Sequence, residues 1–349
     1  MRTLSLLHRW IGAIGGLLLA VLGLTGTLLV WRNDLTFVDH AGDPVHADPA
    51  TLARIAAALA DGPKPVDRIT FAGDGLGVHQ VIFTDGTGAY LSQAGATVAR
   101  CSTSWQRPEL WLFDLHHRLL IGDTGEAITG VAGLIGLFFV VSGVILWWRM
   151  RKRFRLRLWP ATMKPGAIVH HHRDIGVVTA PVLIVTLVTG VLMVFPALGG
   201  PLLAEPRARP PKVALLQDQT ARRNLGPLFA EAVRMFPGAD IRRLQWPRKA
   251  GAPLVLRLRQ SFEWTPNGRT FVYADPVTLA VIGHADPATG STAASIREKL
   301  YPVHAAKTGG LPWRLAMSVS GIALTLLGSL AMYGFWQTKW NVRRARRRA

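Results

Sequence analysis

Hydrophobic residues along this chain are concentrated in four long blocks. The blocks span residues 10–31, 128–148, 175–195 and 315–336, and none contains Asp, Glu, Lys or Arg. A helix that rises about 1.5 Å per residue needs about 20 apolar residues to cross the hydrocarbon core of a bilayer. Each block holds 21 or 22 residues, so the pattern predicts four transmembrane helices in contact with a lipid bilayer.

A signal peptide or a large soluble core would fit these blocks less well. A cleaved signal peptide has a shorter apolar stretch and a small-residue cleavage site, and the first block has neither feature. Buried helices of a large soluble protein rarely form uninterrupted charge-free runs of this length. Glycines and Pro181 inside the blocks are tolerated in membrane helices. Tryptophans mark the block ends, as an interfacial aromatic belt does: Trp10, Trp31, Trp147, Trp148, Trp313 and Trp336.

Basic residues beside the blocks predict the orientation. Segment 149–157 carries six basic residues and no acid, the tail 339–349 carries six more, and Arg2 and Arg9 precede the first block. Cytoplasmic loops carry an excess of Lys and Arg, so both termini are expected in the cytoplasm. The net charge of +19 is then mainly a topology signal, and no nucleic-acid partner is expected.

The two long connections then lie on the opposite side of the membrane. Segments 51–60 and 221–236 have helical periodicity, and 78–84, 253–259 and 269–275 alternate like strands. The expected fold class is therefore an all-α four-helix transmembrane bundle with two outer α+β domains. Transmembrane helices are expected at 1–31, 127–149, 173–196 and 313–338, outer domains at 32–126 and 197–312, a basic cytoplasmic loop at 150–172 and a basic tail at 339–349.

An internal repeat relates the two halves of the chain. The motif HRxxG occurs at 8–12 and at 172–176, and Thr-Gly follows each histidine after seventeen residues, as Thr25-Gly26 and Thr189-Gly190. A weaker pair precedes the second and fourth blocks, where His116 and His304 are each followed by glycine. Each unit contributes two spans, so the two-helix repeats are parallel, related by an axis along the membrane normal.

Histidines lie near both ends of the predicted bundle. His8 and His172 fall at the inner ends of the first and third helices, and His304 pairs with His116 or His117 at the outer ends. Ionisable residues at such depths are costly unless paired or liganded. Facing imidazoles bind metals and can hold a haem iron from both sides. Purely interfacial histidines are the alternative, and the repeat favours ligation.

Neighbouring residues refine this hypothesis. Arg9 and Arg173 are candidates to bind haem propionates, and Gly12 and Gly176 to leave room for a flat ring. The spacing LHxxLL favours His116 over His117 but leaves the choice open. The remaining histidines are expected at interfaces or on the surface: His170, His171, His40, His46, His79 and His284. The single cysteine, Cys101, excludes c-type haem attachment and thiolate-held clusters.

Several segments resemble the PepSY-associated transmembrane family of iron-regulated membrane proteins. They are LLHRWIGAIGGLLLAVLGLTG, DLHHRLLIGDTG, VSGVILWW, HHHRDIG and FVYADPVTLAVIG, in which Leu279 stands where the family usually has glycine. The resemblance implies a bacterial inner-membrane location, periplasmic PepSY-like domains, two haem b groups and a role in iron acquisition. It also implies that His8, His116, His172 and His304 ligate the haem iron, and that periplasmic ferric siderophores are reduced.

The expected function is therefore transmembrane electron transfer to a periplasmic acceptor, most simply a ferric siderophore. No GxGxxG or Walker motif is present, so the electron donor is expected to be a separate cytoplasmic reductase or a quinol. Two alternatives are a non-enzymatic membrane-anchored PepSY module that binds or regulates periplasmic partners, and an iron or haem transporter. The absence of charge within the blocks disfavours a proton-coupled transporter.

Overall fold

A computed structural model describes the chain at residues 2–154, 160–203, 210–213 and 224–348. It separates into two compact units. We call them the membrane unit (Met1–Trp31, Leu112–Gly200 and Val303–Ala349) and the sheet unit (Arg32–Trp111 and Pro201–Pro302).

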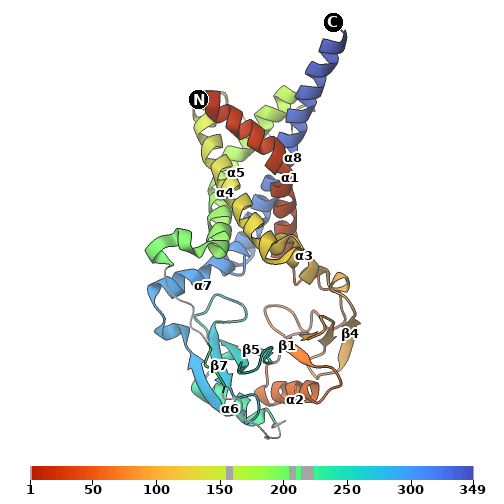
Figure 1. Cartoon of the computed structure of the whole chain (residues 1–349), viewed down its shortest axis with the longest axis vertical. Helices are drawn as coiled ribbons and strands as arrows, with labels where there is room; N and C mark the ends of the chain where they lie inside the picture. The colour runs from red at the N-terminus through yellow and green to blue at the C-terminus, as the bar shows by residue number, and fades with distance from the viewer. Residues whose placement is uncertain (1, 155–159, 204–209, 214–223, 349) are drawn as a thin grey trace. The chain divides into compact units, whose positions relative to one another are not determined.

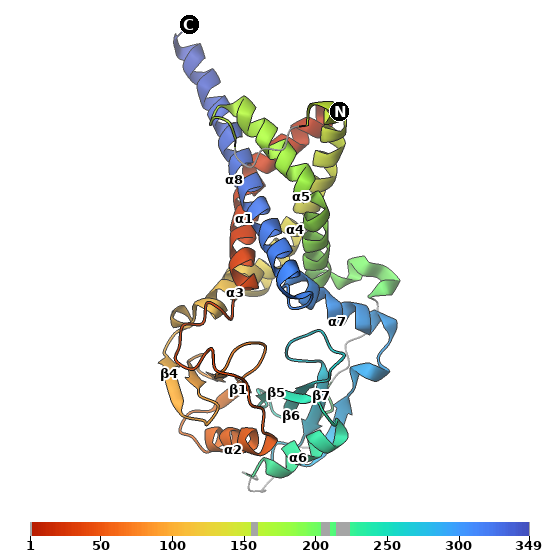
Figure 2. The same ribbon diagram turned by 180° about the vertical axis from the view of Figure 1, so that it is seen from behind.

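Four helices of the membrane unit are long and apolar enough to cross a bilayer. They are α1 (Arg2–Val30), α4 (Gly122–Trp148), α5 (Pro165–Val194) and α8 (Gly310–Arg348). The prediction of four membrane-spanning helices is confirmed. Figures 1 and 2 show both chain ends at the same end of this bundle.

The four helices are arranged with an approximate two-fold relation. α1 packs on α8 and α4, while α5 packs on α4 and α8, so α1 lies diagonally across from α5 (Figures 1 and 2). If α1 is exchanged with α5 and α4 with α8, every pair of helices that pack on each other stays the same. This arrangement is the one that a parallel repeat of two-helix units predicts.

Glycines let α1 and α8 approach closely. A Cβ atom at Gly16 would lie 2.7 Å from the carbonyl oxygen of Gly328, and one at Gly23 would lie 2.5 Å from that of Gly321. Lipid provides no hydrophobic force between helices, so close van der Waals packing at small residues stabilises such pairs. The Thr325 hydroxyl also lies 3.2 Å from the Ala20 carbonyl oxygen, across the same contact.

Short helices precede the second and fourth spans. α3 (Pro108–Arg118) and α7 (Thr292–His304) are followed by left-handed backbone before α4 and α8 begin. The positive φ angles are 50° at Leu119 and 63° at Leu120 in the first break, and 52° at Ala306 in the second. A break in the helical backbone thus precedes both the second and the fourth span.

The sheet unit contains one eight-stranded antiparallel sheet with the order β4-β3-β2-β1-β5-β6-β7-β8. Its strands are β1 (Val66–Thr70), β2 (His79–Phe83), β3 (Gly88–Leu91), β4 (Thr97–Cys101), β5 (Asp240–Gln245), β6 (Leu254–Arg259), β7 (Thr270–Ala274) and β8 (Val281–Ala285). β1 pairs with β5 and places Ile69 opposite Leu244. The two outer segments, expected as separate domains, therefore build one unit.

One face of this sheet is covered by α2 (Pro49–Ala60) and α6 (Gly226–Met235), which pack on each other (Figures 1 and 2). The core beneath them is apolar and includes Ala56, Ile69, Phe229, Leu244 and Leu256. Alternation along β6 directs Leu254, Leu256 and Leu258 into this core.

The chain is therefore mixed α and β, and the all-α description applies only to the membrane unit. Residues 221–223 of the helix expected at 221–236 lie outside the described residues.

His79 corrects one expectation from the sequence. It was expected on the surface, but its side chain is fully buried and its Nδ1 accepts a hydrogen bond of 2.8 Å from the Ala72 amide. Its ring also packs edge-on against Phe71. Burial lowers the pKa of His79 to about 4.

This buried imidazole makes the stability of the sheet unit depend on pH. Between about pH 6.5 and pH 4 the unfolded chain binds more protons at His79 than the folded chain, so the free energy of unfolding falls as pH falls through this window. The full loss is about 3 kcal/mol. Urea unfolding at pH 7 and pH 4.5 measures it, and His79→Gln is expected to remove most of it. His46→Gln, at an exposed histidine, is the control; equal pH dependence in wild type and His79→Gln would refute the assignment.

The close contact between α1 and α8 predicts the effect of a single methyl group. Gly23→Ala is expected to destabilise the bundle by about 1–3 kcal/mol, because its Cβ collides with backbone. Gly15→Ala is the matched control, since nothing lies within 4 Å of a Cβ at that position. Thermal melting of the purified protein in detergent compares the two. Equal melting temperatures would contradict the packing described here.

Candidate functional site

The helices of the membrane unit bring four histidines together as two pairs. His8 on α1 faces His172 on α5, with ring centroids 6.2 Å apart and ring planes at 89°. His116 on α3 faces His304 on α7, also with centroids 6.2 Å apart, and with ring planes at 45°. Each pair joins positions related by the internal repeat.

The separation within each pair suits two ligands of one metal ion. A metal-bound imidazole nitrogen lies about 2 Å from the metal and its ring centre about 1 Å beyond, so two rings on opposite sides of one ion have centroids about 6 Å apart. In the described residues, no cluster of three or more His, Cys, Asp or Glu side chains is arranged to hold a metal. A pair supplies two ligands, and a haem macrocycle supplies the four that complete the coordination of iron.

A threonine hydroxyl orients His116. The Thr25 hydroxyl lies 3.0 Å from His116 Nδ1 and donates its own proton to the Val21 carbonyl oxygen at 2.8 Å. The hydroxyl oxygen is therefore an acceptor for the imidazole, which places the ring proton on Nδ1. The lone pair of Nε2 then remains for a metal, as in most histidine-ligated sites.

His304 has the same arrangement in the second repeat. Its Nδ1 lies 3.1 Å from the Thr189 hydroxyl and 3.0 Å from the Thr186 carbonyl oxygen. The Thr189 hydroxyl donates to the Val185 carbonyl oxygen at 2.7 Å, so it accepts from the ring. Both imidazoles of this pair are thus fixed in the tautomer that leaves Nε2 available.

Ser142 on α4 holds His8 at the other pair. Its hydroxyl lies 2.8 Å from His8 Nδ1 and donates to the Phe138 carbonyl oxygen at 2.6 Å. The His8 ring also packs edge-on against Phe139, with centroids 5.1 Å apart. Sequence patterns did not identify Ser142, because a lone serine inside an apolar span resembles many helix-packing serines.

The glycine after each threonine makes room for the imidazole. A Cβ atom at Gly26 would lie 3.0 Å from His116 Cε1, and one at Gly190 would lie 3.0 Å from His304 Cε1. The repeated Thr-Gly pair thus has two roles, a hydrogen bond and a close approach. The sequence revealed the repeat, but only the structure shows what the pair contacts.

The structure also separates the competing histidines. His117 stacks on Phe113, and its Nε2 lies 3.7 Å from Glu126 Oε1, so it is not part of the pair with His304. His170 is exposed, while His171 is buried outside either pair.

The two arginines proposed for propionates differ in their surroundings. Arg9 is exposed, whereas Arg173 forms a largely buried ion pair with Asp174, with Nε 2.7 Å from Oδ1. The position equivalent to Asp174 in the first repeat is Trp10. The role of both arginines in propionate binding stays a prediction, and Asp174 is a partner that sequence patterns did not indicate.

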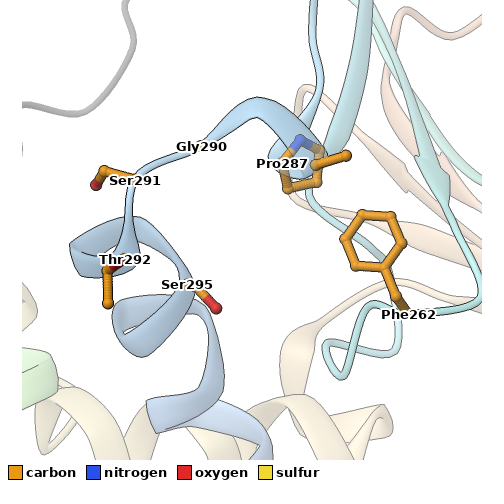
Figure 3. Close-up of a pocket in the computed structure, with 7 residues that line it drawn as sticks. Phe262, Pro287, Gly290, Ser291, Thr292 and Ser295 are labelled. Atoms are coloured by element: carbon orange, nitrogen blue, oxygen red, sulfur yellow. The ribbon is translucent and has the colours of Figure 1, made fainter.

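A shallow pocket of about 450 Å³ lies in the sheet unit, and none of the residues that line it is a histidine. Figure 3 shows the Phe262 ring beside Pro287, with Thr292 and Ser295 on the adjoining turn of α7. It contains no metal-binding or acid–base group, so it adds nothing to the histidine pairs.

Four apolar helices define a multi-pass membrane protein, and its paired histidines are candidate cofactor sites. The profile described as PepSY-associated TM region matches residues 5–338, so the chain belongs to the PepSY-associated transmembrane family. Membership indicates a membrane protein of the iron-regulated type. No curated protein shows a significant match to the chain.

The hydroxyl contacts predict the behaviour of threonine variants. Thr25→Val and Thr189→Val preserve side-chain shape but remove a hydroxyl acceptor at Nδ1. Thr25→Val is expected to weaken haem affinity about 10–100-fold. Thr189→Val is expected to weaken it less, because the Thr186 carbonyl oxygen still accepts from His304. Haem titration into protein purified without haem measures this affinity. Thr179→Val is the control, because the Thr179 hydroxyl bonds only to the Ile175 carbonyl oxygen. Unchanged affinity in both variants would show that these hydroxyls do not support the ligands.

Proposed function

We propose that this protein carries electrons across the bacterial inner membrane through two haem b groups and reduces a periplasmic ferric siderophore. The observation that carries the proposal is the presence of two histidine pairs with the same spacing in one bundle. His8 and His172 would hold one haem, and His116 and His304 the other.

The positions of the pairs along the helices support a transmembrane route. His8 and Thr25, which contacts His116, are separated by seventeen residues of α1. At 1.5 Å per residue this is about 25 Å, close to the hydrocarbon thickness of a bilayer of about 30 Å. One pair therefore lies near each end of the apolar region.

Haem iron supplies one-electron chemistry that amino-acid side chains do not provide. The chain itself orients the imidazoles that would bind the haem iron. Ser142, Thr25 and Thr189 hold the Nδ1 protons of three of the four imidazoles, which raises the basicity of the opposite nitrogen. Apolar helices exclude water from the route, and burial and hydrogen bonding of the ligands are the means by which a protein sets a haem potential.

The charge pattern supports the direction of transfer. Basic residues follow α4 at Arg149, Arg151 and Lys152 and recur at the end of α8, which are features of cytoplasmic ends. Electrons would thus enter near His8 and His172 from a separate cytoplasmic reductase or a quinol, and leave near His116 and His304. The sheet unit would then lie in the periplasm, with the acceptor.

Spectroscopy of the purified full-length protein tests the proposal. A reduced-minus-oxidised spectrum with haem quantitation is expected to show two b-type haems per chain. His8→Ala and His304→Ala are each expected to lose one of them, because each removes one axial ligand. His117→Ala is the matched control, since His117 lies next to His116 but contacts Glu126 instead.

A wild-type protein without haem absorption, after expression with ample haem, would overturn the proposal. Retention of two haems in both His8→Ala and His304→Ala would overturn the assignment of the ligands. Stopped-flow oxidation of the dithionite-reduced protein by ferric siderophores then measures the transfer step, which is expected to be lost in both variants.

A further inference from the structure

The face of the sheet opposite α2 and α6 carries a row of arginines. Alternation along β1, β5 and β6 turns Ile69, Leu244 and Leu256 towards the core. The intervening positions are Arg68, Arg243 and Arg257, and we call these three residues the arginine row.

Strand pairing brings the members of the arginine row together. Arg243 lies directly opposite Arg257 in the β5–β6 pair and opposite Thr70 in the β1–β5 pair. Arg68 is two residues from Thr70 and is therefore a diagonal neighbour of Arg243. Like charges directly opposite each other in a sheet destabilise it, so the row needs a compensating interaction.

The described residues provide little of that compensation. Arg243 Nε donates to the Thr70 hydroxyl at 3.1 Å, and Arg257 donates from both Nε, at 2.7 Å, and Nη2 to the Gly268 carbonyl oxygen. Both acceptors are neutral, and no described carboxylate hydrogen-bonds to either guanidinium. Arg68 differs, because it is paired with Asp67 at 2.8 Å.

Nearby charges add to the positive potential. Burial first, and then Arg68 and Arg32, lower the pKa of Arg243 to about 10. Burial, Arg269 and Arg243 lower the pKa of Arg257 to about 9, against the opposing effect of Glu263 and Tyr301. Both side chains remain charged at neutral pH. The buried Nε of Arg32 lacks a hydrogen-bond partner, which adds an unsatisfied donor to the same group.

We propose that the arginine row, with Arg32, binds the carboxylate groups of a small polyanionic ligand. Guanidinium groups bind carboxylates through two parallel hydrogen bonds. Arg243 retains both Nη groups for this purpose, and Arg257 retains Nη1 and the second proton of Nη2. The next step rests on the proposed function, in which this ligand is the iron acceptor. The acceptor is then a ferric chelate rich in carboxylate groups rather than a neutral ferric chelate.

A solvated charged surface does not account for the row. Arg234 on α6 shows what such a surface looks like here: its side chain is 75% exposed and paired with Glu231. Arg243 and Arg257 are instead largely withdrawn from solvent and face each other. Buried charges of one sign are costly without a partner, and a bound anion is the partner that restores the balance.

Calorimetric titration of the full-length protein with citrate and with ferric citrate tests the proposal. Arg243→Gln and Arg257→Gln are expected to weaken binding of both at least about tenfold, since each removes a two-point carboxylate contact. Arg234→Gln removes the same charge elsewhere and is expected to change affinity less than about twofold. A neutral ferric trishydroxamate is expected to bind at least about tenfold more weakly than ferric citrate.

Melting temperatures separate binding from folding. Arg243→Gln is expected to melt no lower than wild type without ligand, because it relieves the repulsion with Arg257. If it unfolds instead, Arg243→Lys, which keeps the charge but not the planar fork, must still bind citrate more weakly than wild type at an unchanged melting temperature.

The proposal is overturned if the wild-type protein binds neither citrate nor ferric citrate. It is also overturned if the Arg243→Gln and Arg257→Gln variants bind these ligands as tightly as the wild type does. A third contrary result is arginine-dependent binding to anionic-lipid nanodiscs alone. Iron-free citrate binding does not require haem. A protein that lacks haem but binds citrate through these arginines would therefore refute the proposed electron transfer and leave the anion site standing.

Discussion

The hydrogen bond from a buried imidazole to a hydroxyl on a neighbouring helix is the interaction on which the candidate sites depend. An uncompensated imidazole inside an apolar bundle is costly, and a freely rotating one is a poor ligand. Thr25, Thr189 and Ser142 address both problems, because each accepts from Nδ1 while its own proton is held by a carbonyl one turn back. The Nε2 atoms of these three imidazoles thereby keep their lone pairs available for a metal. Removing the hydroxyl of Thr25 or Ser142 leaves the imidazole Nδ1 without this acceptor, whereas His304 keeps the Thr186 carbonyl oxygen when the Thr189 hydroxyl is removed.

The broken segments before α4 and α8 follow from the same requirement. His116 and His304 lie on α3 and α7, and left-handed residues such as Leu119 and Ala306 separate these short helices from the spans. A continuous helix fixes the direction of each side chain relative to its own axis. A break frees the preceding helix to present its histidine to the diagonal partner. Non-helical backbone is tolerated near membranes only where protein or a cavity satisfies it, so these breaks are consistent with structured sites.

The sequence predicted the parts of this structure that are governed by period and composition. The four spans followed from charge-free length, and strands β2, β6 and β7 from alternation. The pairing of His8 with His172 followed from HRxxG. By contrast, His116 and His117 are adjacent on α3, so the rotation of α3 about its axis decides which of them pairs with His304. No sequence pattern specifies that rotation. Burial of His79 and the fusion of both outer segments through β1 and β5 depend on contacts between distant residues, such as Ile69 with Leu244. Local patterns do not contain that information.

Comparison of the two repeats indicates where their roles diverge. In the bundle, Thr25 and Thr189 contact equivalent histidines with nearly equal geometry, as two sites of the same chemistry require.

In the sheet, pairing of β1 with β5 makes Arg68 and Arg243 equivalent. The position equivalent to Arg257 on β6, however, is Ile82 on β2. The second outer segment, residues 197–312, carries 16 basic and 8 acidic residues, and Arg243 and Arg257 place part of this basic excess beside the junction of the halves. If stability alone were selected, isoleucine would be favoured at position 257 as it is at position 82, because two arginines that face each other destabilise the folded sheet. The asymmetry therefore favours a ligand-binding role for the second half of the sheet, while the symmetric bundle keeps two equivalent cofactor sites.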